Sequence, residues 1–126
     1  MKQAWLVDDD EEMAAAVSLM IKVLGYSPRS FLAAPDAGRA LLSGERPDLI
    51  LLDLNMPQVS GKDFLEFVRS RAEFDQLPIV MLSSEFSDKH VNELLDIGAD
   101  AYVSKPVSIE ELESAIGKAV NKRAKA

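Results

Sequence analysis

The sequence predicts an α/β fold with a mainly parallel sheet between helices. Short apolar runs alternate with longer amphipathic segments, and three of the runs, AWLV, LILL and IVML, have no polar face. The alternation is typical of βα units, and strands that are apolar on both sides are typical of the buried centre of a parallel sheet. A chain of 126 residues can bury one such core, so we expect one domain spanning residues 1–126.

Five strands are expected, one on each apolar run. We place them at residues 3–7, 26–31, 48–52, 78–82 and 101–104. The second contains Pro28, which has no N–H group to donate to a neighbouring strand, so we expect it at an edge of the sheet. The segments between the strands predict helices at residues 11–24, 36–42, 62–71, 88–97 and 110–119.

Local signals mark several helix ends. Gly25 is a natural C-terminal stop for the first helix, because glycine adopts a positive φ without strain. Ser108 and Glu111 stand three residues apart at the start of the last helix, which is the spacing of a capping box. We expect the tail NKRAKA, residues 121–126, to be a frayed polar end.

Composition narrows the range of functions. The 14 basic and 21 acidic residues leave a formal charge of −7, which repels a polyanion, so we expect no direct binding of nucleic acid. The absence of cysteine excludes disulfides and thiolate chemistry and fits a reducing compartment. We find neither an export signal nor the roughly 20 consecutive apolar residues that a membrane span needs. A cytoplasmic location is therefore expected.

Polar residues follow the apolar strand runs, at the end of the sheet where open parallel sheets bind ligands. They are Asp8, Asp9 and Asp10 after the first run, Asp53 after the third, Ser83 and Ser84 after the fourth, and Lys105 after the fifth. Because the carboxyl ends of parallel strands meet at one edge, we expect these side chains to converge on one site.

The three consecutive acids allow two interpretations. Carboxylates cap helix N-termini and gain about 0.3–1 kcal/mol from the helix dipole, but one or two acids suffice for that. A further acid facing Asp53 adds repulsion on the order of 4 kcal/mol per close pair at an effective dielectric of about 20, before screening. A hard divalent cation bound between the carboxylates turns this repulsion into attraction. Mg²⁺ (or Mn²⁺) suits such a site, because it binds a few carboxylates and leaves open positions for phosphate oxygens.

Asp53, Lys105 and Ser83 each have a structural and a chemical interpretation. Asp53 can form an Asx turn, Lys105 can be a solvated loop lysine, and Ser83 can be a plain turn residue. In the chemical interpretation, the Asp53 carboxylate is a nucleophile toward phosphorus and forms an acyl phosphate beside a metal ion. Lys105 then offsets the phosphate charge, and the Ser83 hydroxyl donates to a phosphoryl oxygen.

Taken together, the motifs resemble the receiver domain of two-component response regulators of the CheY-like type. The segment LVDDDEE resembles the acidic pair after the first strand, and DLILLDLNMPQVSG resembles the phosphoacceptor strand and its turn. PIVMLSSE resembles the strand with its hydroxyl residue, and GADAYVSKP resembles the strand that ends in Lys-Pro. The resemblance covers essentially the whole chain. It implies a doubly wound (βα)5 flavodoxin-like fold of three layers, with a five-stranded parallel sheet of order 2-1-3-4-5.

The resemblance also implies roles for single residues. It makes Asp53 the phosphoacceptor, and the metal ion is held by Asp8, Asp9, Asp53 and the backbone carbonyl of Asn55. The phosphoryl oxygens are held by Ser83 and Lys105. Tyr102 is the switch aromatic, and the Lys105–Pro106 bond is cis. Asn55 and Glu85 occupy positions that tune the lifetime of the phosphoryl group, and Ser84 stands where the family usually has alanine. An ordinary edge-strand aromatic remains an alternative for Tyr102.

By the same resemblance, the chain is a signalling phosphoacceptor and not an enzyme with an external substrate, because it catalyses only its own Mg²⁺-dependent phosphorylation and dephosphorylation. The expected phosphodonor is a histidine kinase or a phosphotransfer protein. Phosphate draws Ser83 inward and Tyr102 follows. The face formed by residues 88–97, 101–104 and 110–119 then changes its affinity for a protein output target.

Three other functions remain open from the residues alone. A phosphate-independent, receiver-like interaction module would bind partners without phosphorylation. A phosphatase of the haloacid dehalogenase type would turn over an external phosphomonoester, although its nucleophile normally follows the first strand. A flavodoxin-like cofactor protein would need hydroxyls and glycines after the first strand, where this chain has three carboxylates.

Overall fold

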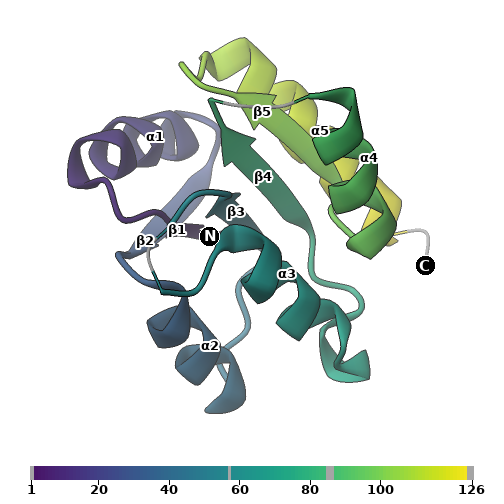
Figure 1. Ribbon diagram of the computed structural model, residues 1–126. Coiled ribbons are helices and arrows are strands. Elements are labelled where there is room, and N and C mark those ends of the chain that lie inside the picture. The colour runs from purple at the N-terminus through teal and green to yellow at the C-terminus, as the bar shows by residue number, and fades with distance from the viewer. Residues whose placement is uncertain (1, 57, 85–86, 125–126) are drawn as a thin grey trace.

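The computed structural model describes residues 2–56, 58–84 and 87–124. The strands of this described part are β1 (Lys2–Val7), β2 (Tyr26–Phe31), β3 (Leu49–Asp53), β4 (Ile79–Ser83) and β5 (Ala101–Ser104). Neighbouring strands are parallel and lie in the order β2-β1-β3-β4-β5 (Figure 1). The predicted flavodoxin-like fold is confirmed, and β2 with its Pro28 lies at an edge as expected.

The helices cover both faces of this sheet. They are α1 (Glu11–Val23), α2 (Ala34–Leu42), α3 (Gly61–Arg69), α4 (Asp88–Ile97) and α5 (Ile109–Ala124), with a short 3₁₀ turn, η1 (Ala72–Phe74), before β4. Buried side chains of α1 and α5 share one apolar cluster with one face of the sheet, and those of α2, α3 and α4 share a second cluster with the other face (Figure 1). The fold therefore has three layers.

Side chains of the central strands alternate between the two apolar clusters. In β1, Trp5 and Val7 belong to the cluster of α2, α3 and α4, whereas Ala4 and Leu6 belong to the cluster of α1 and α5. Every residue of β3 and β4 is buried. Both faces of these strands need apolar residues, which explains why the corresponding sequence runs have no polar side.

The ends of α1 follow the predicted signals. Gly25 has a φ of +95° directly after the helix, as a C-terminal stop requires. At the other end, the Asp10 carboxylate accepts hydrogen bonds from the backbone N–H groups of Glu12 and Met13 at 3.0 and 3.1 Å. Asp10 is therefore the capping acid of the triplet.

Capping also sets the starts of α3 and α5. Before α5, the Ser108 hydroxyl oxygen accepts from the Glu111 N–H at 3.2 Å, and the Glu111 carboxylate accepts from the Ser108 hydroxyl at 3.1 Å. A second capping box, formed by Ser60 and Asp63, starts α3 at Gly61, one residue earlier than predicted. Ser60 and Asp63 stand three residues apart, the same spacing that marks the start of α5.

The predicted frayed tail is wrong for residues 121–124. These residues continue α5, because Arg123 is tied to three other parts of the chain. Its Nε donates to an Asp100 carboxylate oxygen at 2.8 Å, and its other nitrogens donate to the carbonyls of Asp75 and Gly98, each at 2.9 Å. Residues 125 and 126 lie outside the described part of the chain.

Candidate functional site

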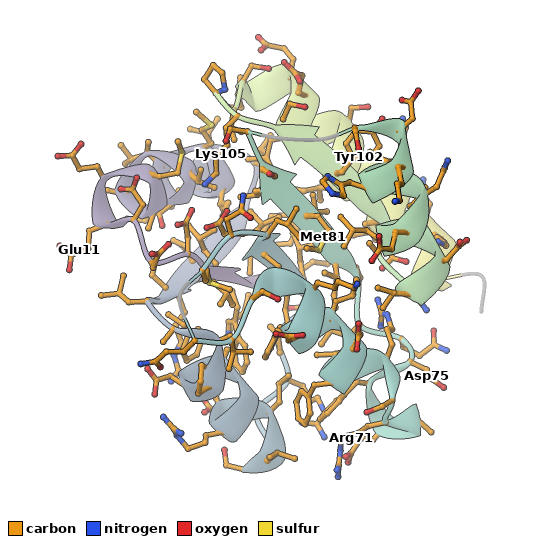
Figure 2. The ribbon with its side chains drawn as sticks, viewed as in Figure 1. Glu11, Arg71, Asp75, Met81, Tyr102 and Lys105 are labelled. Atoms are coloured by element: carbon orange, nitrogen blue, oxygen red, sulfur yellow. The ribbon has the colours of Figure 1, made fainter. Side chains whose placement is uncertain are left out.

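Carboxylates and a lysine from three strand ends meet at the carboxyl edge of the sheet. Asp8 follows β1, Asp53 ends β3, and Lys105 follows β5. The Lys105 Nζ lies 3.1 Å from Asp53 Oδ1 and 3.4 Å from Asp8 Oδ2. Figure 2 shows Lys105 at the end of the sheet to which the strands point, whereas Arg71 and Asp75 lie at the opposite end. The predicted convergence of these three side chains is confirmed.

Asp9 completes an acidic cluster with Asp8 and Asp53. Each of the three residues offers a carboxylate oxygen, and these oxygens lie within 4.8 Å of one another. Asp8 and Asp53 are buried, while Asp9 is exposed. Hard divalent cations bind such oxygen sets, so the donor chemistry of the cluster fits Mg²⁺ or Mn²⁺.

Backbone hydrogen bonds hold Asp8 at this edge. Its N–H donates to the carbonyl of Phe31, the last residue of β2, at 3.0 Å, which extends the pairing of the two strands one residue beyond the end of β1. One carboxylate oxygen of Asp8 accepts from the N–H of Asp10 at 2.9 Å. Asp10 caps α1 instead of joining the cluster, so one acid of the triplet caps the helix and the other two, Asp8 and Asp9, lie beside Asp53.

The charges of the site act on one another through the low dielectric of the sheet edge. Burial is the largest cause that raises the pKa of Asp53, and the negative charge of Asp8 adds to it. Hydrogen bonds from Lys105 and the backbone of Asn55 offset part of this rise. Burial alone would lower the pKa of Lys105, but its hydrogen bonds and attraction to Asp53 and Asp8 outweigh burial and raise it.

Gly61 allows α3 to begin directly against the Asp53 backbone. A Cβ atom at Gly61 would lie 2.2 Å from the Asp53 carbonyl oxygen and 2.8 Å from the Leu54 Cα, which no side chain tolerates. The Gly61 N–H donates to the Leu54 carbonyl at 2.9 Å, and the Leu54 N–H donates to the Leu82 carbonyl at 2.9 Å. The turn after the acidic residue is therefore held between α3 and β4.

Ser83 and Tyr102 lie on the two strands that border the cluster. Ser83 is the buried last residue of β4, and its carbonyl accepts from the Lys105 N–H at 2.8 Å. Tyr102 lies on the edge strand β5, opposite Met81 of β4, with 47% of its surface exposed. The Lys105–Pro106 peptide bond is cis, as the family resemblance implied.

The other residues expected near the site occupy its rim. Asn55 and Ser84 are exposed, and Asn55 lines a hollow of about 280 Å³ between the turn after β3 and α4. Glu85 lies outside the described residues.

Two charge groupings away from the site were not expected from the sequence. Asp100 lies in the turn before β5, where it is buried and paired with Arg69 and Arg123. Lys62 of α3 pairs with Glu93 of α4. The sequence carried only a weak signal for either group, because arginines, lysines and acids at these positions are ordinary on helix surfaces.

The parallel sheet with its acidic pocket and adjacent lysine defines a receiver-type signalling domain. A family model described as the response regulator receiver domain matches residues 4–117. The chain belongs to this family and is a receiver domain of two-component signalling.

Solved structures of the same type match along nearly the whole chain. The Vibrio cholerae chemotaxis protein CheY4 is similar with a TM-score of 0.84 and 28% identity, over 94% of this chain and 98% of that one. A CheY-like receiver domain protein from Methanospirillum hungatei is similar with a TM-score of 0.84 and 26% identity, over 99% of this chain and 98% of that one. These likenesses support the fold and the family together.

Curated relatives are longer proteins. The chain is 35% identical over 116 residues to the transcriptional regulatory protein AfsQ1 of Streptomyces coelicolor, which covers 92% of this chain and 50% of that protein. It is 33% identical over 120 residues to the phosphate regulon transcriptional regulatory protein PhoB of Rhizobium meliloti, which covers 95% of this chain and 52% of that protein. The chain thus spans about half the length of these relatives. Within its described residues, no helix is both long and apolar enough to cross a bilayer.

Proposed function

We propose that Asp53 accepts a phosphoryl group from a phosphohistidine of a histidine kinase or phosphotransfer protein. The observation that carries this proposal is the single ammonium group of Lys105, 3.1 Å from the buried Asp53 carboxylate, beside two further acids. An acidic pocket that holds one lysine suits a phosphoryl group whose charge is shared between that lysine and a metal ion. Membership of the receiver family supports the same assignment.

The metal ligands in this proposal are the carboxylates of Asp8, Asp9 and Asp53 and the backbone carbonyl of Asn55. The proximity of the three carboxylate oxygens supports the set, since they repel one another without a cation. When bound, Mg²⁺ supplies positive charge that neutralises the transferring phosphoryl group. Oxygen ligands of this kind also accept Mn²⁺.

The reaction is a transfer between two nucleophiles. A carboxylate oxygen of Asp53 forms a bond to phosphorus while the bond from phosphorus to the histidine nitrogen breaks, and the leaving imidazole takes up a proton. Lys105 Nζ and the Ser83 hydroxyl donate hydrogen bonds to the phosphoryl oxygens. Hydrolysis of the acyl phosphate by water returns the Asp53 carboxylate and inorganic phosphate. Both reactions act on the chain itself, so it has no external turnover substrate.

Phosphorylation changes the surface formed by α4, β5 and α5 in this proposal. The Ser83 hydroxyl moves toward the phosphoryl group, and the half-exposed ring of Tyr102 turns inward behind it. Tyr102 lines a hollow of about 550 Å³ together with Leu95 of α4 and Ala115 of α5, so its movement reshapes that surface. A protein output target then binds this surface with altered affinity.

The receiver unit comprises residues 1–126 in this proposal and works in the cytoplasm. The family match over residues 4–117 supports the extent, and the absence of cysteine fits a reducing compartment.

Intact-mass spectrometry after incubation with acetyl phosphate tests the proposal. We expect one phosphoryl adduct on the wild-type chain in the presence of Mg²⁺, and none on Asp53→Asn or after removal of Mg²⁺. The matched control is Asp36→Asn, which alters an exposed acid on α2 and should be phosphorylated like the wild type. An adduct on Asp53→Asn would refute the assignment, and no adduct on any variant would favour the phosphate-independent interaction module.

A further inference from the structure

α4 is held to the sheet by less apolar burial than the other helices. Leu94 is the one buried residue of α4, whereas α2 buries five residues and α3 four. Hollows lie on both sides of the helix. Residues of α4 line two surface hollows of about 570 and 280 Å³ together with α3 and the turn after β3, and Leu95 of α4 lines one of about 550 Å³ together with β5 and α5. Few buried contacts and flanking space are features of an element that can move.

The C-terminal end of α4, by contrast, is clamped. The carbonyl of Gly98, directly after the helix, accepts hydrogen bonds from Arg69 Nε of α3 and from Arg123 Nη2 of α5, each at 2.9 Å. Both arginines also donate to the buried carboxylate of Asp100. A Cβ atom at Gly98, whose φ is +131°, would lie 2.7 Å from Arg69 Cγ. This end of α4 is therefore fixed to α3 and α5.

The body of α4 has a much weaker attachment. Among the residues that the structure describes, Lys62 and Glu93 form the ion pair that joins α4 to another helix, and their side chains are 43% and 40% exposed. Both residues line both hollows on the α3 side, so the pair spans the groove between α3 and α4. An exposed ion pair opens at low cost and is weakened by salt.

The pair also connects α4 with the acidic site. Lys62 directly follows Gly61, whose backbone is packed against the carbonyl of Asp53. A rearrangement of the turn after Asp53 therefore displaces the anchor of the pair on α3. The other anchor, Glu93, lies one residue before Leu94 on the same helix.

We propose that α4 pivots about the Gly98 clamp and that the Lys62–Glu93 pair holds it in its resting position against α3. Opening the pair releases the N-terminal turns of α4 while the C-terminal end stays fixed. The use of this movement as a signal rests on the proposed phosphorylation of Asp53, which loosens the pair through Gly61 and Lys62. The pivot itself is a property of the unphosphorylated chain.

Amide hydrogen exchange of the full chain, without phosphodonor or Mg²⁺, tests the pivot. In Glu93→Gln and in Lys62→Met, we expect exchange in residues 88–97 to rise about two- to fivefold, the range that an exposed pair supplies. The rise should be largest in the first turns and vanish toward Gly98. Raised NaCl should have the same effect on the wild type and no added effect on Glu93→Gln.

The matched control is Asp36→Asn, which breaks the exposed pair with Arg39 on α2 and should leave exchange in α4 unchanged. Unchanged exchange in Glu93→Gln, a rise of equal size in all helices, or a rise centred on Gly98 would each overturn the pivot.

Exchange measured on the phosphorylated chain distinguishes a failure of this inference from a failure of the proposed function. Once an adduct on Asp53 is established by mass, exchange in α4 should rise in the wild type and should not rise further in Glu93→Gln. If Asp53 is phosphorylated and α4 exchange in the wild type does not change, the regulatory role of the pair is wrong. If Asp53 accepts no phosphoryl group, the proposed function fails, while the exchange measurements without phosphodonor still decide the pivot.

Discussion

Buried charges gather at both ends of the sheet, and the two clusters are built in opposite ways. At the carboxyl ends of the strands, the ammonium group of Lys105 pairs with the carboxylates of Asp8 and Asp53, and Asp9 adds a third carboxylate beside them. Negative charge is in excess there, and the raised pKa of Asp53 reflects its burial and the repulsion from Asp8. The protein maintains this imbalance at a cost in stability.

At the opposite end, the single carboxylate of Asp100 is paired with two guanidinium groups and lies 3.6 Å from the ammonium group of Lys122. Asp100 accepts from Arg69 at 3.0 Å, from Arg123 at 2.8 Å and from the N–H of Ile79 at 2.9 Å. Arg69 also donates to the carbonyls of Gly98, Phe74 and Leu77. Burial lowers the pKa of Arg69 to about 10, although the charge of Asp100 opposes this.

The difference separates a site built for a ligand from a site built for the fold. A structural ion cluster completes its hydrogen bonds within the chain, because an unpaired buried charge is strongly destabilising. A ligand site leaves charge uncompensated where the ligand will supply it. Removing one charge from the structural cluster should therefore destabilise the fold, whereas removing one carboxylate from the acidic cluster should reduce the repulsion within it.

The largest effect is expected at the structural cluster. Asp100→Asn removes the buried carboxylate between two half-buried arginines and should lower the free energy of unfolding by about 3–5 kcal/mol. Urea unfolding followed by the fluorescence of Trp5, the single tryptophan of the chain and fully buried, measures the change. Asp36→Asn, at an exposed ion pair, should change it by less than about 0.5 kcal/mol. If Asp100→Asn and Asp36→Asn changed the free energy of unfolding by similar amounts, the structural role assigned to the Asp100 cluster would be wrong.

A divalent cation should stabilise the chain through the acidic cluster. At a Mg²⁺ concentration about 100 times its Kd, the free energy of unfolding should rise by about 2.7 kcal/mol. Asp9→Asn should lose most of this gain because it removes a proposed ligand, and Asp36→Asn should retain it. Unfolding curves with MgCl₂, compared with NaCl of equal ionic strength, provide the measurement. An equal gain in Asp9→Asn would place the ion elsewhere.

The smallest effect is the pH dependence that Asp53 contributes. Because its pKa is raised in the fold, the folded chain holds this proton more tightly than the unfolded chain does. Ionisation of Asp53 therefore lowers stability as the pH rises from the ordinary carboxylate pKa to the raised value. In Mg²⁺-free buffer, Asp53→Asn should gain stability relative to the wild type across that window and keep the gain at neutral pH. If the difference in free energy of unfolding between Asp53→Asn and the wild type were the same at all pH values, the predicted pH dependence would be wrong.

Local patterns were sufficient to predict most of the fold. The strands and helices were placed correctly to within a few residues, because apolar periodicity records which faces are buried. The largest error concerned α5, which extends to Ala124 where a frayed tail was expected. Of the added residues, Val120 packs against the apolar core, but Asn121, Lys122 and Arg123 are polar and give no apolar signal. The bonds of Arg123 to Asp75, Gly98 and Asp100 order this end of the helix.

The order of polar residues at the strand ends also followed from the sequence. A parallel sheet brings the carboxyl ends of its strands to one edge, so the convergence of Asp8, Asp53 and Lys105 needed no knowledge of distances. The proposed metal site and phosphoacceptor follow from the residue types at that edge. The sequence by itself therefore determined the fold class and the location of the site, and it supplied the residue types from which the chemistry is proposed.

The tertiary structure alone decided which charges pair and how completely. Lys105 and Asp8 are 97 positions apart, Arg69 and Asp100 are 31 apart, and Arg123 and Asp100 are 23 apart. No local pattern links residues at such separations, because side-chain charges on helices are ordinarily solvated and record no partner. The clamp at the end of α4 and the exposed Lys62–Glu93 pair between α4 and α3 depend on how the helices pack on the sheet, which only the folded chain specifies.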